Sequence, residues 1–152
     1  MQKAIVCDID DTIVKPREHY APIQNVINFL KQNAGTYKII MLTARYHDDL
    51  YDLTIKQLSD LGIKYDMLIM EPGKHPSHHE KMSIEHAVYK TNEVRKLMEK
   101  YNVVLFIDNS KPARKGVKML GVETKKPENI KRSEEHTSEL QSPYVISYAV
   151  FC

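Results

Sequence analysis

Apolar runs alternate with segments of helical periodicity over the first 124 residues. Four runs lack polar alternation, as strands buried on both faces do: 4–7, 38–42, 66–70 and 103–107. A shorter run at 122–124 predicts a fifth strand. Three segments carry apolar residues three and four positions apart, which predicts helices: 22–33, about 48–61 and about 84–100. Ser110 caps a last predicted helix. Strands alternating with helices predict an α/β fold, a Rossmann-like three-layer sandwich around a parallel sheet of about five strands.

Residues 132–152 do not follow this pattern. They resemble an in-frame translation of a common sequencing adapter oligonucleotide, with matching blocks on both sides of a short gap at 143–145. An ordinary C-terminal strand with a polar lead-in is the alternative. We therefore expect one domain over 1–131 and a non-native tail over 132–152, which is not used to predict the fold.

Composition restricts the class of protein only broadly. The chain is 42% hydrophobic and 28% charged, and it has no apolar run near the roughly 18 residues that a membrane span needs. Its two cysteines, Cys7 and Cys152, provide no disulfide framework, and no secretory signal precedes the first strand. Both features favour a reducing cytoplasm. The net charge of +2 neither requires nor excludes a polyanionic partner.

Three carboxylates follow the first predicted strand within four residues: Asp8, Asp10 and Asp11. In open parallel sheets the ligand crevice lies just beyond the carboxyl ends of the strands. Like charges gathered there repel one another unless a cation holds them, so this stretch predicts a metal site. The alternative is an acidic turn that caps a helix, which suits Asp11 and Thr12.

Polar residues also follow two other predicted strands and enter one helix. Thr43 and Arg45 end the second strand, Asp108 and Asn109 end the fourth, and Lys90 lies in the helix before it. Each residue alone would be an ordinary cap or a solvated charge. Together with Asp8 and Asp10 they supply a carboxylate nucleophile, a second carboxyl group, a hydroxyl, a cation and a distal acid, which suits phosphoryl transfer.

These residues resemble the motifs of the haloacid dehalogenase (HAD) superfamily of phosphohydrolases. The resemblance spans residues 3 to about 124 and rests on Asp8-Ile9-Asp10-Asp11-Thr12, Thr43, Lys90 and Asp108. Within the superfamily the chain is most similar to the phosphatase domain of phage polynucleotide kinases, through Asp-Ile-Asp, Thr-Ala-Arg and Ile-Asp-Asn before Gly-Val-Glu.

The resemblance implies a covalent mechanism that depends on Mg²⁺. Asp8 would attack phosphorus and form an aspartyl-phosphate. Asp10 would protonate the leaving oxygen and then activate water. The Asp8 carboxylate, the Asp10 backbone carbonyl and Asp108 would bind Mg²⁺.

The resemblance also implies that Thr43 and Lys90 bind phosphate oxygens, with Arg45 as an additional clamp. Lys81 precedes the same helix and is the alternative to Lys90, which fits the family's distance to Asp108 better. Many relatives carry a second acid near Asn109. Asn109 is expected beside the metal and supplies an oxygen without charge, so metal affinity is expected to be lower.

The function implied is a Mg²⁺-dependent phosphomonoesterase that acts on the 3′-phosphate ends of nucleic acid, in the cytoplasm, or in the host cytoplasm if the chain is phage-encoded. The connections at 15–21 and 71–81 are too short for a capping domain, and an open site admits large substrates. A phosphatase of small phosphate esters or nucleotides is the alternative. No GxxxxGK[ST] motif is present, so no kinase accompanies the phosphatase in this sequence.

The motifs disfavour two non-catalytic classes of protein. A signalling receiver domain also combines acids, Thr and Lys on a parallel sheet, but its accepting Asp ends strand three, where this chain has Met70 and Glu71. Intact Asp8 and Asp10 argue against an inactive phosphopeptide- or nucleic-acid-binding derivative.

Two further groups of polar residues are candidate binding sites. His75, His78 and His79 lack the accompanying ligands of a zinc site and predict loop surface. Basic residues on the last predicted helix offer a weak groove for a phosphate backbone: Lys111, Arg114, Lys115 and Lys118.

If residues 132–152 are adapter-encoded, nothing selected their apolar side chains to match the rest of the chain. Truncation after Lys131 is therefore expected to change the free energy of unfolding by less than about 1 kcal/mol, the scale of a surface change. Chemical denaturation of the full and truncated chains measures this. A truncated chain that fails to fold would show that the segment belongs to the fold.

Overall fold

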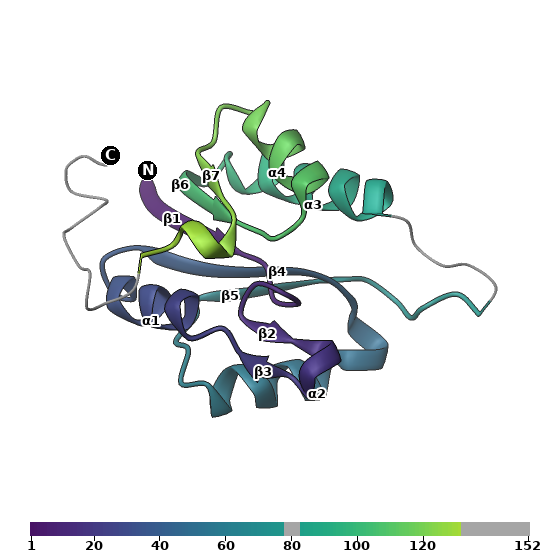
Figure 1. The fold of residues 1–152 in the computed structure, drawn as a ribbon. Coiled ribbons are helices and arrows are strands. Elements are labelled where there is room, and N and C mark those ends of the chain that lie inside the picture. The colour runs from purple at the N-terminus through teal and green to yellow at the C-terminus, as the bar shows by residue number, and fades with distance from the viewer. Residues whose placement is uncertain (78–82, 132–152) are drawn as a thin grey trace.

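The computed structural model describes residues 1–77 and 83–131. A five-stranded sheet of order β5-β4-β1-β6-β7 lies at its centre, and every strand pair in it is parallel (Figure 1). Its strands are β1 (Gln2–Cys7), β4 (Lys38–Tyr46), β5 (Met67–Glu71), β6 (Tyr101–Ile107) and β7 (Thr124–Lys125). The α/β class and the parallel sheet of about five strands are therefore confirmed.

Two helices cover each face of the sheet, as Figure 1 shows. One face carries α1 (Gln24–Asn33) and α2 (His47–Asp60), and the other carries α3 (Ser83–Leu97) and α4 (Lys111–Lys118). The alternation of side chains along the strands builds both cores. Ile5 and Cys7 of β1 contribute to the core under α1 and α2, whereas Ala4 and Val6 contribute to the core under α3 and α4. Burial on both faces explains why β1 is an unbroken apolar run.

The segment between β1 and α1 contains structure that the sequence pattern did not predict. Its two-residue strands β2 (Val14–Lys15) and β3 (Ala21–Pro22) pair antiparallel, on either side of a 3-10 helix, Pro16–Glu18. Strands this short have too few residues to show an alternating pattern. A second 3-10 helix, Pro127–Asn129, follows β7. The β2–β3 hairpin is far smaller than a capping domain, so it leaves the adjacent end of the sheet open.

Three sequence predictions lie outside the described residues: the tail at 132–152, Lys81 as the alternative to Lys90, and His78 with His79. Over residues 1–77 and 83–131, no helix combines the length and apolar character required to cross a membrane.

Helices α3 and α4 approach each other closely at Gly116. A Cβ atom added there would lie 2.3 Å from Oγ1 of Thr91. Gly116→Ala should therefore destabilise the fold by about 1–3 kcal/mol, although alanine favours helix more than glycine does. The free energy of unfolding from denaturant titration measures this effect. Adding Thr91→Ala should restore most of the loss, and an equally unstable double variant would mean that the cause lies elsewhere.

Candidate active site

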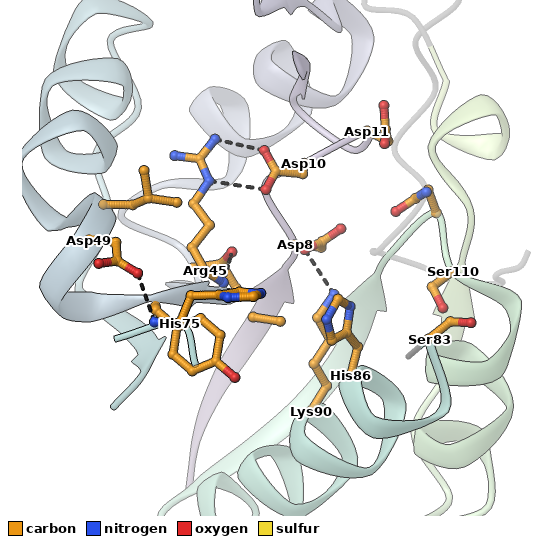
Figure 2. A pocket seen from close by; sticks show the side chains of 15 residues that line it. Asp8, Asp10, Asp11, Arg45, Asp49, His75, Ser83, His86, Lys90 and Ser110 are labelled. Carbon is orange, nitrogen blue, oxygen red and sulfur yellow. Dashed lines mark hydrogen bonds and ion pairs between the residues drawn. The ribbon is translucent and has the colours of Figure 1, made fainter. Parts of the chain in front are cut away.

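A cleft of about 570 Å³ lies where β1, β4 and β6 end. The first residues after β1, the last residues of β4 and the residues after β6 line it together with α3. Figure 2 shows Asp8 at the centre, Asp10 and Arg45 on one side and Lys90 on the other. The parallel sheet thus brings together polar residues as far apart in sequence as Asp8 and Ser110.

Lys90 lies between two buried carboxylates. Its Nζ donates to Oδ1 of Asp8 at 2.9 Å and to Oδ2 of Asp108 at 2.7 Å. None of the three residues is more than 5% exposed. One buried cation thus faces two buried anions, so this cluster has a net negative charge when both acids are ionised.

The electrostatics of the cluster favour the protonated form of Asp8. Burial, and then the neighbouring Asp108 carboxylate, raise the pKa of Asp8 to about 7, although Lys90 acts in the opposite direction. Burial alone would lower the pKa of Lys90, but Asp8 and Asp108 raise it above its ordinary value. Lys90 therefore remains charged, and a further positive charge beside Asp8 would favour its ionised form.

Short local hydrogen bonds fix the two carboxylates. Thr12 Oγ1 donates to Oδ2 of Asp8 at 3.0 Å and accepts the backbone N–H of Asn109 at 3.1 Å, which ties the loop after β1 to the end of β6. The backbone N–H of Ser110 donates to Oδ1 of Asp108 at 2.8 Å. The tight turn that places Thr12 beneath Asp8 requires a left-handed backbone at Asp11, where φ is 60°.

Arg45 binds Asp10 with both ends of its fork. Nη2 donates to Oδ1 at 2.7 Å and Nε donates to Oδ2 at 3.1 Å. Nη1 donates to Thr54 and Gln57 of α2, each at 2.8 Å. Four of the five guanidinium N–H groups are thus used by protein acceptors. The structure therefore places Arg45 against Asp10, and its predicted role as a phosphate clamp stays a prediction.

Oxygen atoms converge around the side chain of Asn109. One terminal atom of its amide lies 3.1 Å from Oδ2 of Asp8, 3.2 Å from the Asp10 carbonyl oxygen and 3.3 Å from Oδ1 of Asp108. All three neighbours are acceptors, so the amide nitrogen is favoured in that position. Among the described residues, no three acidic, histidine or cysteine side chains form a metal cluster, because the Asp10 side chain turns to Arg45. Two carboxylates, a carbonyl and an amide are nevertheless oxygen donors of the type that Mg²⁺ prefers.

The remaining predicted residue, Thr43, is buried and lines the cleft. Its Oγ1 accepts the backbone N–H of Arg45 at 3.1 Å, which orients the hydroxyl at the end of β4. On the predicted basic helix, Arg114 turns inward and donates to the carbonyl of Asp108 at 2.8 Å, whereas Lys111, Lys115 and Lys118 are exposed.

Several cleft residues were missed by sequence reasoning: Tyr46, Asp49, His75, Ser83, His86 and Ser110. His75 was predicted as loop surface, but the loop returns to the N-terminus of α2, where the N–H of His75 donates to Asp49 at 2.8 Å (Figure 2). No periodicity announces such a contact. Thr54, which accepts from Arg45, could have been found from sequence, because it is a polar residue on the otherwise apolar buried face of α2.

No protein-family model matches the chain, and no curated protein does. Solved structures that share its fold include two of one complex. A chain in the structure of the Pnkp1/Rnl/Hen1 RNA repair complex has a TM-score of 0.67 and 20% identity over 83% of this chain and 42% of that chain. A chain in a second structure of the Pnkp1/Rnl/Hen1 complex has a TM-score of 0.63 and 22% identity over 83% and 46%. The likeness is one of fold. This chain spans less than half the length of either.

Asp8 predicts a pH dependence of stability. Its pKa is raised from 3.8 to about 7 in the folded state, so the folded protein binds the proton more tightly, and ionisation costs stability as pH rises through this window. The difference in Tm between Asp8→Asn and the metal-free original protein should therefore be more positive at about pH 8 than at about pH 5.

Thermal unfolding in the presence of a chelator measures this difference. Asp11→Asn is the matched control, because Asp11 is exposed and its substitution should give the same difference at both pH values. A difference for Asp8→Asn that is constant with pH would contradict the unbalanced charge of the cluster.

Proposed function

We propose that this chain is a Mg²⁺-dependent phosphomonoesterase that forms an aspartyl-phosphate on Asp8 and acts on 3′-phosphate ends of nucleic acid. The observation that carries the proposal is the buried Asp8–Lys90–Asp108 cluster at the base of an open cleft. A buried carboxylate that is held in a fixed orientation is suited to act as a nucleophile toward phosphorus, once a cation offsets the negative charges of the cluster and of the phosphate.

In the first half-reaction, an Asp8 carboxylate oxygen attacks phosphorus and the bond from phosphorus to the leaving oxygen breaks. Lys90 and Thr12 hold Asp8 in place, each through a hydrogen bond to a different carboxylate oxygen. Fixing the nucleophile in this way converts a bimolecular encounter into a reaction of positioned groups. The Thr43 hydroxyl, which lines the cleft, would donate to a phosphate oxygen.

Asp10 supplies the proton to the leaving oxygen and takes a proton from the water that later hydrolyses the phosphoaspartate. Arg45 uses one lone pair on each Asp10 oxygen, so a lone pair on each remains for this proton. The Asp10 side chain is 38% exposed, which allows contact with substrate and water. Arg45 is thus a positioning residue for Asp10.

The donors around Asn109 fit a Mg²⁺ ion by type and by charge. The Asp8 and Asp108 carboxylates and the Asp10 carbonyl would hold it, and Asn109 would join them only after its amide turned to present oxygen in place of nitrogen. When bound, Mg²⁺ supplies positive charge that neutralises phosphate and the two acids. That charge would also favour the ionised form of Asp8.

Three features support nucleic-acid ends as the substrate. The cleft lies at the carboxyl ends of the strands, and the β2–β3 hairpin, with strands of two residues, is too small to enclose it, so a large substrate can enter. The fold is also shared with chains of an RNA repair complex. Lys111, Lys115 and Lys118 provide a weak basic surface on α4, the helix that follows the cleft residue Ser110.

Hydrolysis of a 3′-phosphorylated oligonucleotide, a 5′-phosphorylated one and a small phosphate ester tests the proposal. We expect the 3′-phosphate to be preferred, with an advantage over the small ester that shrinks as salt rises. A chelator should abolish activity and Mg²⁺ should restore it. Asp8→Asn should be inactive, and Asp10→Asn should lose about 10²-fold or more.

Asp11→Asn serves as the matched control, because Asp11 lies in the same acidic run but outside the cluster. Near-normal activity of Asp8→Asn would contradict covalent catalysis. Equal rates on all three substrates, unchanged by salt, would instead favour a phosphatase of small esters.

A further inference from the structure

The wall of the cleft next to α2 is aromatic. Tyr46, the last residue of β4, and His75, from the loop after β5, both line the cleft that contains Asp8 and Asp10. Their rings meet edge to face, with centroids 5.5 Å apart and planes at 79°. Such an arrangement fixes the orientation of one ring by the edge of the other.

Backbone hydrogen bonds hold this wall in place. The N–H of Asp48 donates to the carbonyl of Gly73 at 2.9 Å, and the N–H of His75 donates to the Asp49 carboxylate at 2.8 Å. The loop is therefore fastened to the first turn of α2 on both sides of Lys74. The aromatic pair is thus anchored to secondary structure before any ligand arrives, which lowers the entropic cost of binding.

The charges around this wall disfavour the phosphodiester of a nucleotide but not its base. Asp48 and Asp49 lie in the first turn of α2, and Arg45, a cation that lines the same cleft, is buried and bound to Asp10. A phosphodiester would therefore be repelled here. A nucleobase is uncharged and stacks on aromatic side chains whatever its sequence.

We propose that Tyr46, backed by His75, is the stacking platform for the terminal base of the nucleic-acid strand whose 3′-phosphate reaches Asp8. The inference rests on the proposed function and deepens it, since it names what distinguishes a nucleotide end from a simple phosphate ester. Sequence tolerance follows, because every base has a face that can stack.

Two ring-removing changes, one in the protein and one in the substrate, test this platform. The substrates are a 3′-phosphorylated oligonucleotide, the same strand with a stable abasic analogue at its 3′ end, and glycerol phosphate, which has no ring. Tyr46→Ala should lower kcat/KM on the first by roughly 5- to 150-fold, the range for loss of one stacked base. On the other two substrates it should change little, and Tyr46→Phe should retain the original preference.

Tyr51→Ala is the matched control, because Tyr51 is an exposed tyrosine on α2 that does not line the cleft. It should leave all three rates unchanged. Equal losses of Tyr46→Ala on all three substrates would show a merely structural role and overturn the inference, as would no loss on the base-bearing strand.

A binding measurement separates this inference from the phosphatase proposal. An oligonucleotide with 2-aminopurine as its 3′-terminal base loses fluorescence when that base stacks. Mixed with the Asp8→Asn variant, it should be quenched, and adding Tyr46→Ala should abolish the quenching. Quenching without hydrolysis by the original chain would overturn the phosphatase proposal alone. Hydrolysis without Tyr46-dependent quenching would overturn the stacking platform alone.

Discussion

The contact on which the candidate site depends is that of Lys90 with two buried carboxylates. Its ammonium group lies within hydrogen-bond distance of Asp8 and Asp108, which come from different strands. Burying charges is costly unless they are paired, and here the pairing is incomplete because two anions share one cation. Burial, and then the neighbouring Asp108 carboxylate, raise the pKa of Asp8. A site built in this way lowers the stability of the folded chain alone and would favour the binding of a cation.

The sheet explains why this contact can form at all. β1 lies between β4 and β6, so the residues after β1 are flanked by the ends of both neighbours. Lys90 reaches them from the middle of α3, which packs on the same face as α4. Gly116 allows the close approach of these two helices at Thr91, next in sequence to Lys90. The packing of α3 against α4 therefore helps to position Lys90 in the cleft.

Much of this arrangement was predictable from sequence, because it depends on local spacing. Carboxylates directly after apolar runs fall at the edge of a parallel sheet, which places Asp8, Asp10 and Asp108 without any knowledge of the side-chain contacts. The β2–β3 hairpin was not predictable, because its strands are two residues long. The pairing of Arg45 with Asp10 was not predictable either. Both lie at strand ends, and only the three-dimensional directions of their side chains show that they meet.

The cleft wall at His75 shows the same limit. Its position depends on a backbone N–H that finds the carboxylate of Asp49, 26 residues earlier. Such a bond has no periodic signature, and histidines in a polar loop predict exposed surface. Residues that come from a loop and are fixed by one hydrogen bond are therefore found only in the folded structure, although they line the same cleft as the carboxylates.

Chemical trapping of the phosphorylated protein tests whether Asp8 forms the covalent intermediate. The chain is mixed with a substrate carrying a radiolabelled 3′-phosphate, quenched in acid within one turnover, digested and mapped. We expect label on the peptide that contains Asp8, and none after Asp8→Asn. Release of labelled phosphate at the full rate, with no label on the protein at any quench time, would contradict it.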